Sequence, residues 1–523
     1  MAKYLIANIP IGEGLYGNAN QANIPPGGLI IADGISLAEG GFRKEGGSTR
    51  YATALATGLK IIGGTDWHPV DGSHRMIISA NNGKVYRATG SATGVFSEIA
   101  TGLNTSISQT VFVEAGAEQI GENRKLFLFT GYHSPRYIDG DATSLATMTT
   151  PPSDWSDTAS GAPVFGSNHF GRLFAGGNAN DPHRLYYSTA SDHLVTDGTL
   201  AIYPGEGHKL VGAASFKGYL VCWKYPTGIY YVDSTDPSIS NWRVERLTNS
   251  VGLANPLAFC VIENDIIFLD ATGDFNLLSI VDANSKEASN ITKIAHMAEW
   301  FNNNVNISSL TNARMVYYPH RREVHCALAG TGSIVNNLRV IIDLNNEKPR
   351  YRTSYKDTCE SLWISQDDAG HDQLSSGDDQ GGVWILDQSA RSKDGSGFNA
   401  EFRTAYSDLS YTDPSLSVIE KNFHWLELLV NPTGNYTLSI TIHIDGEATQ
   451  TVDFNMGTIG AALGTFELDT DQLGGSYVLS KKKRLTGSGR EISISGTNSG
   501  NNEDFDVSRI LLHFTPGSSR LAQ

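Results

Sequence analysis

The chain has 523 residues, of which 40% are hydrophobic and 18% are charged, and its formal net charge is −16. This length holds two to four ordinary domains, or one large β architecture with an appendage, and the 55 glycines and 21 tyrosines are typical of an all-β protein with many turns. The negative charge argues against a surface that gains its affinity by neutralising nucleic-acid phosphates.

Cysteine spacing and the N-terminus bear on the compartment. The four cysteines lie far apart without a CxxC pair: Cys222, Cys260, Cys326 and Cys359. Only His325 adjoins one of them, and adjacent residues of a strand point to opposite faces. We therefore expect four buried thiols in a reducing cytoplasm and no metal site. No apolar run suits a signal peptide or a membrane helix, so we expect a soluble protein without membrane insertion.

The N-terminal segment, residues 1–50, contains a strand-like stretch at 28–47 that reads GLIIADGISLAEGGFRKEGG. A β-propeller needs a strand that locks its first and last blades together. We expect this segment to close, in part, the propeller that follows it.

A hairpin pattern recurs through residues 51–388. A short apolar strand, a turn of Gly, Asn or Asp, and a second strand rich in Tyr, Val and Ile occur at 75–88, 124–139, 171–188, 218–233, 265–280, 322–343 and 372–387. The hairpins start roughly 46 to 58 residues apart, and such a period is typical of a β-propeller with four-stranded blades. Hairpins do not reveal outer strands, so seven hairpins predict six to eight blades.

The longest interval between hairpins contains SNITKIAHMAEWFNNN. Apolar residues recur there at helical spacing behind Asn290, which is a suitable N-cap: Ile291, Ile294, Met297, Ala298 and Phe301. We predict one inserted helix near residues 289–304.

A polar stretch at 387–400 has the composition of a linker, and the strands after it are longer. Leu438, Ile440, Ile442 and Ile444 alternate with polar residues, which gives a strand one buried and one solvated face. Residues 400–523 therefore predict a separate C-terminal β-sandwich.

One dense basic run stands in this acidic chain: Lys481, Lys482, Lys483 and Arg484. Two interpretations stay open. The run is either the solvated end of a hairpin, or an electrostatic contact with an acidic neighbouring subunit or with DNA.

Motifs for catalysis are incomplete. SSGDDQGGVWILD resembles the Asp box of sialidases, but Gln380 stands where glycine belongs and Trp384 falls one residue late, so an acidic hairpin turn is the favoured interpretation. His320 and His325 lie five residues apart on a predicted strand, not four apart on a helix as in metalloproteases. Without a nucleophile elbow or a nucleotide-binding loop, we expect no enzyme, cofactor or metal.

A resemblance to a known family starts from Gly41, Phe42, Arg43, Lys44 and Gly46, a strand with an aromatic residue and a basic pair before a glycine turn. Together with the propeller repeats and the appended β domain, this stretch resembles the tail hub or nozzle proteins of short-tailed bacteriophages, including the packaged-DNA stabilisation proteins. The C-terminal stretches EKNFHWLELLV, IHIDGE, GREISISG and FDVSRILLHFTP are similar to the appended domain of those proteins. The family usually has a proline where this chain has a glutamate.

The resemblance implies a virion structural protein, made in the host bacterial cytoplasm, that forms a ring of six copies in the tail. It would contact further copies of itself, the phage adaptor or head-to-tail connector below the portal, and other tail proteins. Its lumen would retain packaged DNA and then pass it without specific binding. An acidic lumen would repel the DNA backbone and so ease that passage.

Two other classes of function stay open. In a receptor- or glycan-binding propeller, exposed aromatic side chains such as Trp223, Tyr225, Tyr230 and Tyr231 would bind sugars, although blade aromatics more often pack between blades. A propeller glycosidase would carry a pair of carboxylates in a central cleft.

Overall fold

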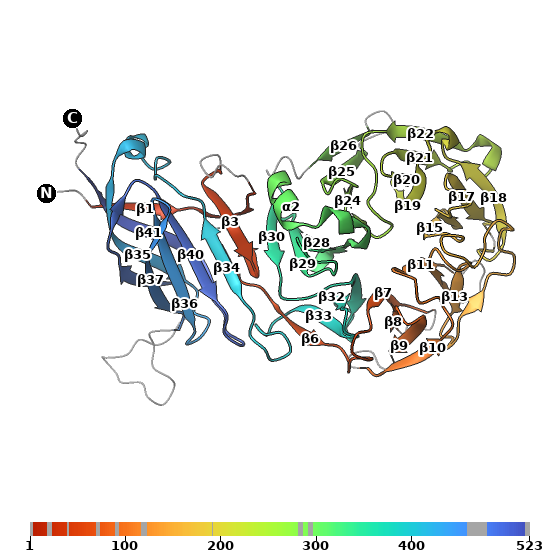
Figure 1. The fold of residues 1–523 in the computed structure, drawn as a ribbon, viewed down its shortest axis with the longest axis horizontal. Coiled ribbons are helices and arrows are strands. Elements are labelled where there is room, and N and C mark those ends of the chain that lie inside the picture. The colour runs from red at the N-terminus through yellow and green to blue at the C-terminus, as the bar shows by residue number, and fades with distance from the viewer. Residues whose placement is uncertain are drawn as a thin grey trace.

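The structure, a computed structural model, describes residues 4–517 except 18–23, 39–40, 70–73, 89–93, 117–122, 191, 281–285, 291–296 and 458–477. Its regular elements are almost all strands, which confirms the all-β prediction. They form a ring of blades and, beside it, a second domain of two sheets (Figure 1). The predicted β-propeller is therefore present.

Six blades are separate four-stranded sheets. Five of them use consecutive strands: β7 (Ile61–Trp67), β8 (Arg75–Ala80), β9 (Lys84–Ala88) and β10 (Phe96–Ala100); β11 (Val111–Ala115), β12 (Lys125–Phe129), β13 (Arg136–Asp139) and β14 (Ala146–Thr147); β15 (Phe165–His169), β16 (Arg172–Gly176), β17 (Arg184–Ser188) and β18 (Thr196–Ala201); β19 (Lys209–Phe216), β20 (Tyr219–Tyr225), β21 (Ile229–Asp233) and β22 (Arg243–Thr248); β23 (Phe259–Val261), β24 (Ile266–Leu269), β25 (Phe275–Ile280) and β26 (Lys286–Asn290).

The sixth separate blade is closed by the N-terminal segment. Its strands are β31 (Ser361–Gln366), β32 (Asp372–Gly377), β33 (Val383–Gln388) and β6 (Gly47–Arg50). β6 is its outer strand and pairs antiparallel with β33. The last blade thus takes its outer strand from residues that precede the first blade in the chain.

A further set of four strands lies between these blades and extends into the second domain: β27 (Arg314–Tyr318), β28 (Glu323–Leu328), β29 (Leu338–Asp343) and β30 (Arg350–Ser354). The innermost strands β23, β27, β31, β7, β11, β15 and β19 follow one another around the axis, and most neighbours among them are in contact. Each of the seven predicted hairpins is the middle pair of strands of one four-stranded unit.

Asp-x-x-Gly turns explain part of this regularity. The pattern occurs at 270–273, 367–370 and 378–381, and the three glycines have φ of 94°, 80° and 79°, a region that glycine adopts without strain. In the last turn Asp378 accepts two backbone N–H groups at 2.6 and 2.8 Å and the indole N–H of Trp384 at 2.8 Å. The stretch that resembles an Asp box is therefore a hairpin turn, as predicted.

The second domain contains most of the N-terminal strands. Its first sheet has the order β38-β35-β41-β5-β4, with β1 beside β41 and β39 beside β35: β1 (Leu5–Ile9), β4 (Ile35–Ala38), β5 (Gly41–Lys44), β35 (Lys421–Val430), β38 (Leu479–Arg484), β39 (Ser488–Gly489) and β41 (Asp506–Pro516). Its second sheet has the order β3-β34-β40-β36-β37, with β2 beside β3: β2 (Ile11–Leu15), β3 (Gly27–Asp33), β34 (Ala400–Thr404), β36 (Thr437–Ile444), β37 (Glu447–Asn455) and β40 (Ile492–Asn498).

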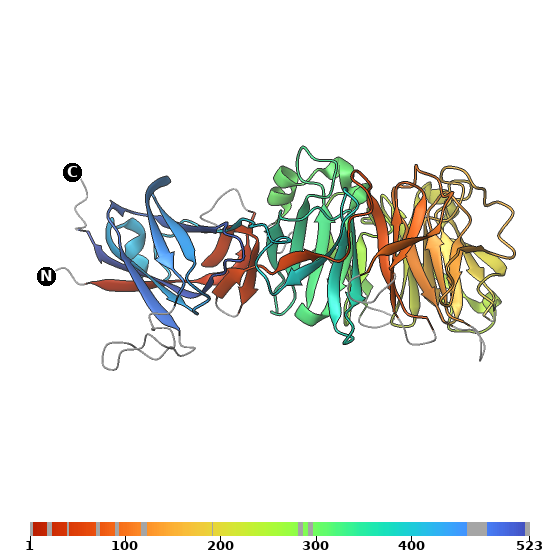
Figure 2. The same cartoon turned by 90° about the horizontal axis from the view of Figure 1, so that it is seen from below.

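One sheet crosses from the propeller into this domain. β30, the outer strand of its blade, lies parallel to β3 at the pair Asp33 and Thr353, and β3 pairs antiparallel with β34. The result is a ten-stranded sheet. The two domains follow one another along the long axis of the molecule (Figure 2).

The inner faces of the two sheets share one apolar core. In β36 the predicted alternation holds, because Leu438, Ile440, Ile442 and Ile444 are buried and the residues between them are half-buried. The ring centroid of Phe42 in β5 lies 4.1 Å from that of Phe402 in β34 of the facing sheet.

Helices are few and short: α2 (Ala298–Asn304), η2 (Pro204–Glu206), η3 (Ile239–Asn241), η4 (Ile307–Asn312), η5 (Pro319–Arg321) and η6 (Pro414–Val418). α2 falls in the predicted insertion, but the proposed N-cap is wrong. Asn290 is the last residue of β26 and pairs through its backbone with Asn276 of β25, because the blade takes its fourth strand from this stretch. Residues 291–296 lie outside the described residues. Within the described ranges, no helix has the length and apolar character to cross a membrane.

Candidate functional site

The stretch that carries the resemblance, residues 41–46, leads from the second domain into the propeller. It begins in β5, which pairs with β41, and ends just before β6. A Cβ on Gly41 would lie 2.5 Å from the carbonyl oxygen of Val507, and the Phe42 side chain is fully buried. Arg43 pairs through its backbone with Asp506. Gly41 and Phe42 thus fix β5 in the core.

Lys44 turns its charge inward. Its Nζ donates to Asn498 Oδ1 at 2.8 Å and to the Gly500 carbonyl oxygen at 3.1 Å, and it lies 4.5 Å from the centre of the Phe398 ring. Burial lowers the pKa of Lys44 to about 8. This lysine connects the segment to the β40 end of the second domain.

Glu45 is surrounded by three cations. One carboxylate oxygen lies 2.5 Å from Arg339 Nη2 and 3.6 Å from Arg352 Nη1, and the other lies 3.5 Å from Lys356 Nζ. All four side chains are at most 2% exposed. Burial alone would raise the pKa of Glu45, but Lys356, Arg339 and Arg352 together hold it well below its usual range. The carboxylate is therefore ionised at neutral pH.

A second buried carboxylate shares one of these cations. Arg352 Nη2 donates to both oxygens of Glu323 at 2.8 Å, and His325 Nε2 lies 3.2 Å from Glu323. Burial lowers the pKa of His325 to about 4, so this imidazole is neutral at neutral pH. His320 lies in η5, outside the strand β28 that holds His325, so the prediction of one strand for both histidines is wrong for His320.

Gly46 is required by a close approach to Asp387. A Cβ at Gly46 would lie 2.4 Å from the Asp387 carboxylate, which in turn pairs with Arg321 Nε at 2.5 Å. The Gly46 carbonyl oxygen accepts a hydrogen bond from Lys356. The glycine therefore lets backbone and charged side chains share one small volume.

We call this cluster the charged joint. Its members are Lys44, Glu45, Gly46, Glu323, Arg339, Arg352, Lys356 and Asp387. They come from the N-terminal segment, from the blade β27–β30 with the segment that follows it, and from β33 of the last blade. Removing one partner of a buried ion pair costs about 3–5 kcal/mol, because the other charge stays buried without compensation. The joint therefore holds the two domains in one geometry.

The basic run lies elsewhere. It belongs to β38, which is four places from β4 in the order of the first sheet. Lys481 Nζ donates to the Gly457 carbonyl oxygen at 2.6 Å, and Lys482 Nζ lies 5.4 Å from the centre of the Trp425 ring. Lys482, Lys483 and Arg484 are exposed. The structure therefore does not bring the basic run and the 41–46 stretch together.

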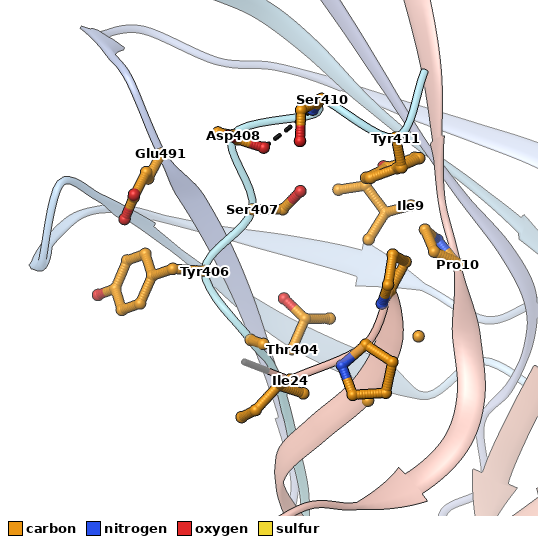
Figure 3. A pocket seen from close by; sticks show the side chains of 15 residues that line it. Ile9, Pro10, Ile24, Thr404, Tyr406, Ser407, Asp408, Ser410, Tyr411 and Glu491 are labelled. Carbon is orange, nitrogen blue, oxygen red and sulfur yellow. Dashed lines mark hydrogen bonds between the residues drawn. The ribbon is translucent and has the colours of Figure 1, made fainter. Parts of the chain in front are cut away.

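A pocket of about 260 Å³ opens within the second domain, between its N-terminal strands β1 and β3 and the segment that follows β34 (Figure 3). Ile9, Pro10 and Ile24 form its apolar side. Its polar groups come from Thr404, Tyr406, Ser407, Asp408, Ser410, Tyr411 and Glu491. The backbone N–H of Ser410 donates to Asp408 Oδ1 at 2.9 Å, and this hydrogen bond fixes the loop.

A second cavity, of about 100 Å³, lies among the innermost strands β7, β11, β27 and β31. Arg314 is the charged side chain of its lining, and within the described residues no Asp or Glu lines it. Burial lowers the pKa of Arg314 to about 10, and its Nη1 donates to the Ala313 carbonyl oxygen at 2.8 Å. The cavity is far too small for a DNA duplex, whose major groove alone is about 12 Å wide.

The aromatic residues named for sugar binding are mostly inside. Trp223, Tyr230 and Tyr231 are buried in the blade, and Tyr225 is 39% exposed. All four cysteines are free and buried, as predicted.

Two groups of residues escaped the sequence analysis. One of the buried cations of the joint, Arg339, interrupts the apolar strand LRVIID, and a charge inside an apolar strand signals a buried partner. Arg352 lies in the polar strand RYRTS and gave no such signal. The second group is Asp66, His68 and His74. Asp66 lies in β7, His68 directly follows that strand, and His74 directly precedes β8. Residues 66 and 68 share one face of an extended chain, a spacing that would have indicated a ligand pair.

Fold and site together define a β-propeller protein whose appended domain is fixed by buried ion pairs. No family model and no curated protein matches the chain. The solved structures that are similar to the chain include three of low sequence identity. The first is PorZ, a bacterial surface component of the type-IX secretion system of Porphyromonas gingivalis, with 12% identity, a TM-score of 0.38, and 66% of this chain but 38% of that chain covered.

The second is a chain of the mitotic checkpoint complex, with 10% identity, a TM-score of 0.39, and 60% and 86% of the two chains covered. The third is the extracellular domain of a hybrid two-component system from B. thetaiotaomicron, with 12% identity, a TM-score of 0.42, and 66% and 40% covered. The chain thus spans well under half the length of the first and third of these proteins.

Proposed function

We propose that this chain is a structural protein of a bacteriophage tail, a tail hub or nozzle. It assembles as a ring of six copies below the portal and adaptor, retains packaged DNA, and gives the DNA a channel for ejection. The observation that supports this proposal best is the location of residues 41–46. Two residues of the family resemblance, Lys44 and Gly46, lie in the charged joint, where the propeller and the appended domain meet. Gly41, Phe42 and Arg43 lead into it through β5.

A protein that holds back packaged DNA has to transmit force between its domains without bending. A ten-stranded sheet that crosses the boundary and a buried network of ion pairs beside it both suit that task. Directional charged contacts demand one geometry of their partners, whereas apolar contacts are non-directional.

In this proposal the DNA channel lies between copies of the chain. The cavity on the propeller axis holds about 100 Å³ and cannot pass a duplex. Six copies would carry six times −16, or −96 charges. A lumen lined with part of this charge repels the DNA backbone and keeps it from adhering.

Assembly tests the proposal. The full chain is purified, and its mass and symmetry are measured by light scattering and class-averaged electron microscopy, alone and mixed with portal and adaptor rings of short-tailed phages. We expect a six-fold ring with a central hole, formed alone or on the adaptor. A monomer that binds none of these rings would contradict the proposal.

A further inference from the structure

Three side chains that could bind a metal ion meet at one end of the propeller axis. Asp66 lies near the end of β7, and His68 and His74 follow it in the chain. One possible ligand atom from each lies within 4.8 Å of those of the other two. Gln366 at the end of β31 and Glu114 near the end of β11 adjoin them. The cluster therefore spans the ends of three neighbouring innermost strands.

The distances suit a shared ion. Asp66 Oδ1 lies 3.2 Å from His74 Nδ1, and Asp66 Oδ2 lies 3.9 Å from His68 Nε2. Two ligand atoms of a tetrahedral zinc site, each about 2.0–2.1 Å from the ion, lie roughly 3.3 Å apart. The two imidazole rings are stacked, with centroids 5.8 Å apart and 20° between their planes. Small side-chain rotations would therefore place His68 Nε2 and His74 Nδ1 within bonding distance of one metal ion.

The charge balance favours a cation. The Asp66 side chain is only 4% exposed, and within the described residues no Lys or Arg nitrogen lies within 4 Å of its carboxylate. Glu114, in contrast, has Arg124 Nη2 at 2.6 Å. A buried carboxylate is stable when a charge or metal ion compensates it, and here two imidazole rings and one backbone N–H face it.

That backbone N–H orients the carboxylate. Gln366 N donates to Asp66 Oδ2 at 2.7 Å, which leaves Oδ1 directed towards His74. Hydrogen bonds of this kind commonly fix the ligands of protein metal sites.

We propose that Asp66, His68 and His74 bind a divalent transition-metal ion of the zinc type. Two imidazoles with a carboxylate suit Zn²⁺, whereas Mg²⁺ and Ca²⁺ prefer oxygen ligands alone. The ion would lie where the first blade meets the second and the last, and it would stabilise that contact. This inference is independent of the proposed tail function.

Zinc titration of the full chain tests the proposal. The protein is first freed of metal with EDTA and dialysed, and Zn²⁺ binding is then measured by isothermal titration calorimetry. We expect one saturable site per chain, and His74→Gln should weaken it at least about 10-fold because a ligand is lost. The matched control is His183→Gln, since His183 Nε2 lies 3.2 Å from Asp181 in a single histidine–aspartate pair.

Cobalt supplies a readout of geometry. Co²⁺ in the same site should give the intense visible absorption of tetrahedral coordination, and His68→Gln should abolish it. The thermal midpoint in EDTA shows whether each variant folds. The proposal is overturned if folded wild-type protein shows no saturable Zn²⁺ binding, or if His74→Gln and wild type bind alike, because the three residues then form hydrogen bonds only.

Discussion

The blades and the charged joint are held together by different forces. Between the blades β15–β18 and β19–β22 the contact is an apolar cluster that contains Phe174, Leu185 and Leu220. At the joint Glu45 lies among three cations, almost without exposure to solvent. Apolar contacts stabilise in proportion to the area they bury, whereas buried ion pairs add stability only in one geometry. The blades thus supply stability, and the joint supplies the orientation of the second domain.

The largest expected effect comes from Glu45→Gln. The change leaves Arg339 and its two neighbouring cations without their carboxylate, so we expect the free energy of unfolding to fall by about 3–5 kcal/mol. Chemical denaturation measures it, and the second domain should separate from the propeller as an additional transition. Glu447→Gln, at an exposed position of β37, is the control and should change nothing. An unchanged denaturation midpoint in Glu45→Gln would contradict the stabilising role of the charged joint.

Gly46→Ala should have the next largest effect. The added methyl group meets the Asp387 carboxylate at 2.4 Å, and overpacking of this kind costs about 1–3 kcal/mol. The thermal midpoint measures the loss. Gly205→Ala is the matched control, because nothing lies within 4 Å of a Cβ there. Equal midpoints in the two variants would show that Gly46 is not constrained.

Acid should weaken the joint before it weakens the blades. The pKa values of Glu45 and Glu323 are both held below their usual range by neighbouring cations, against the effect of burial. A carboxylate with a depressed folded-state pKa stabilises the fold above its unfolded pKa, about 4.3, and this stabilisation is lost as the pH falls further. Stability measured from pH 7 to pH 3 should therefore fall less steeply in Glu45→Gln than in wild type. Parallel curves would contradict this assignment.

The smallest effect on stability is expected at the basic run. Lys482 and Lys483 are exposed on β38, and exposed substitutions usually change stability by less than about 0.5 kcal/mol. The double variant Lys482→Glu, Lys483→Glu should keep the wild-type thermal midpoint. If the run contacts an acidic neighbouring copy, the variant should assemble less than wild type in light scattering, and unchanged assembly would leave the run as a solvated edge.

Local patterns made the blades predictable. The middle two strands of each blade are adjacent in the chain and joined by a single turn or loop. Turns such as 378–381 carry an Asp and a Gly whose roles are visible in the sequence. The outer strands depend on partners far along the chain, so β6 beside β33 could be suggested only in general terms. Asn290 was misjudged because strand pairing overrides a local capping preference.

The joint could not be predicted from local sequence. Glu45 and Arg339 are 294 residues apart in the chain, and no spacing rule relates them. The stretch 41–46 was singled out for its composition, but nothing in it indicated that Lys44 and Glu45 are buried. The signal at Asp66 and His68 was available and needed only the two-residue period of a strand.

Hydrogen exchange resolved by residue tests the joint most directly. The amides of β3, β6 and β30, which pair across or next to the boundary, should exchange as slowly in wild type as those of the middle blade strands. In Glu45→Gln they should lose protection while β16 and β20 keep theirs, because only the joint has been opened. Uniform loss across all strands, or no loss at β6 and β30, would contradict a joint that fixes the second domain independently of the blades.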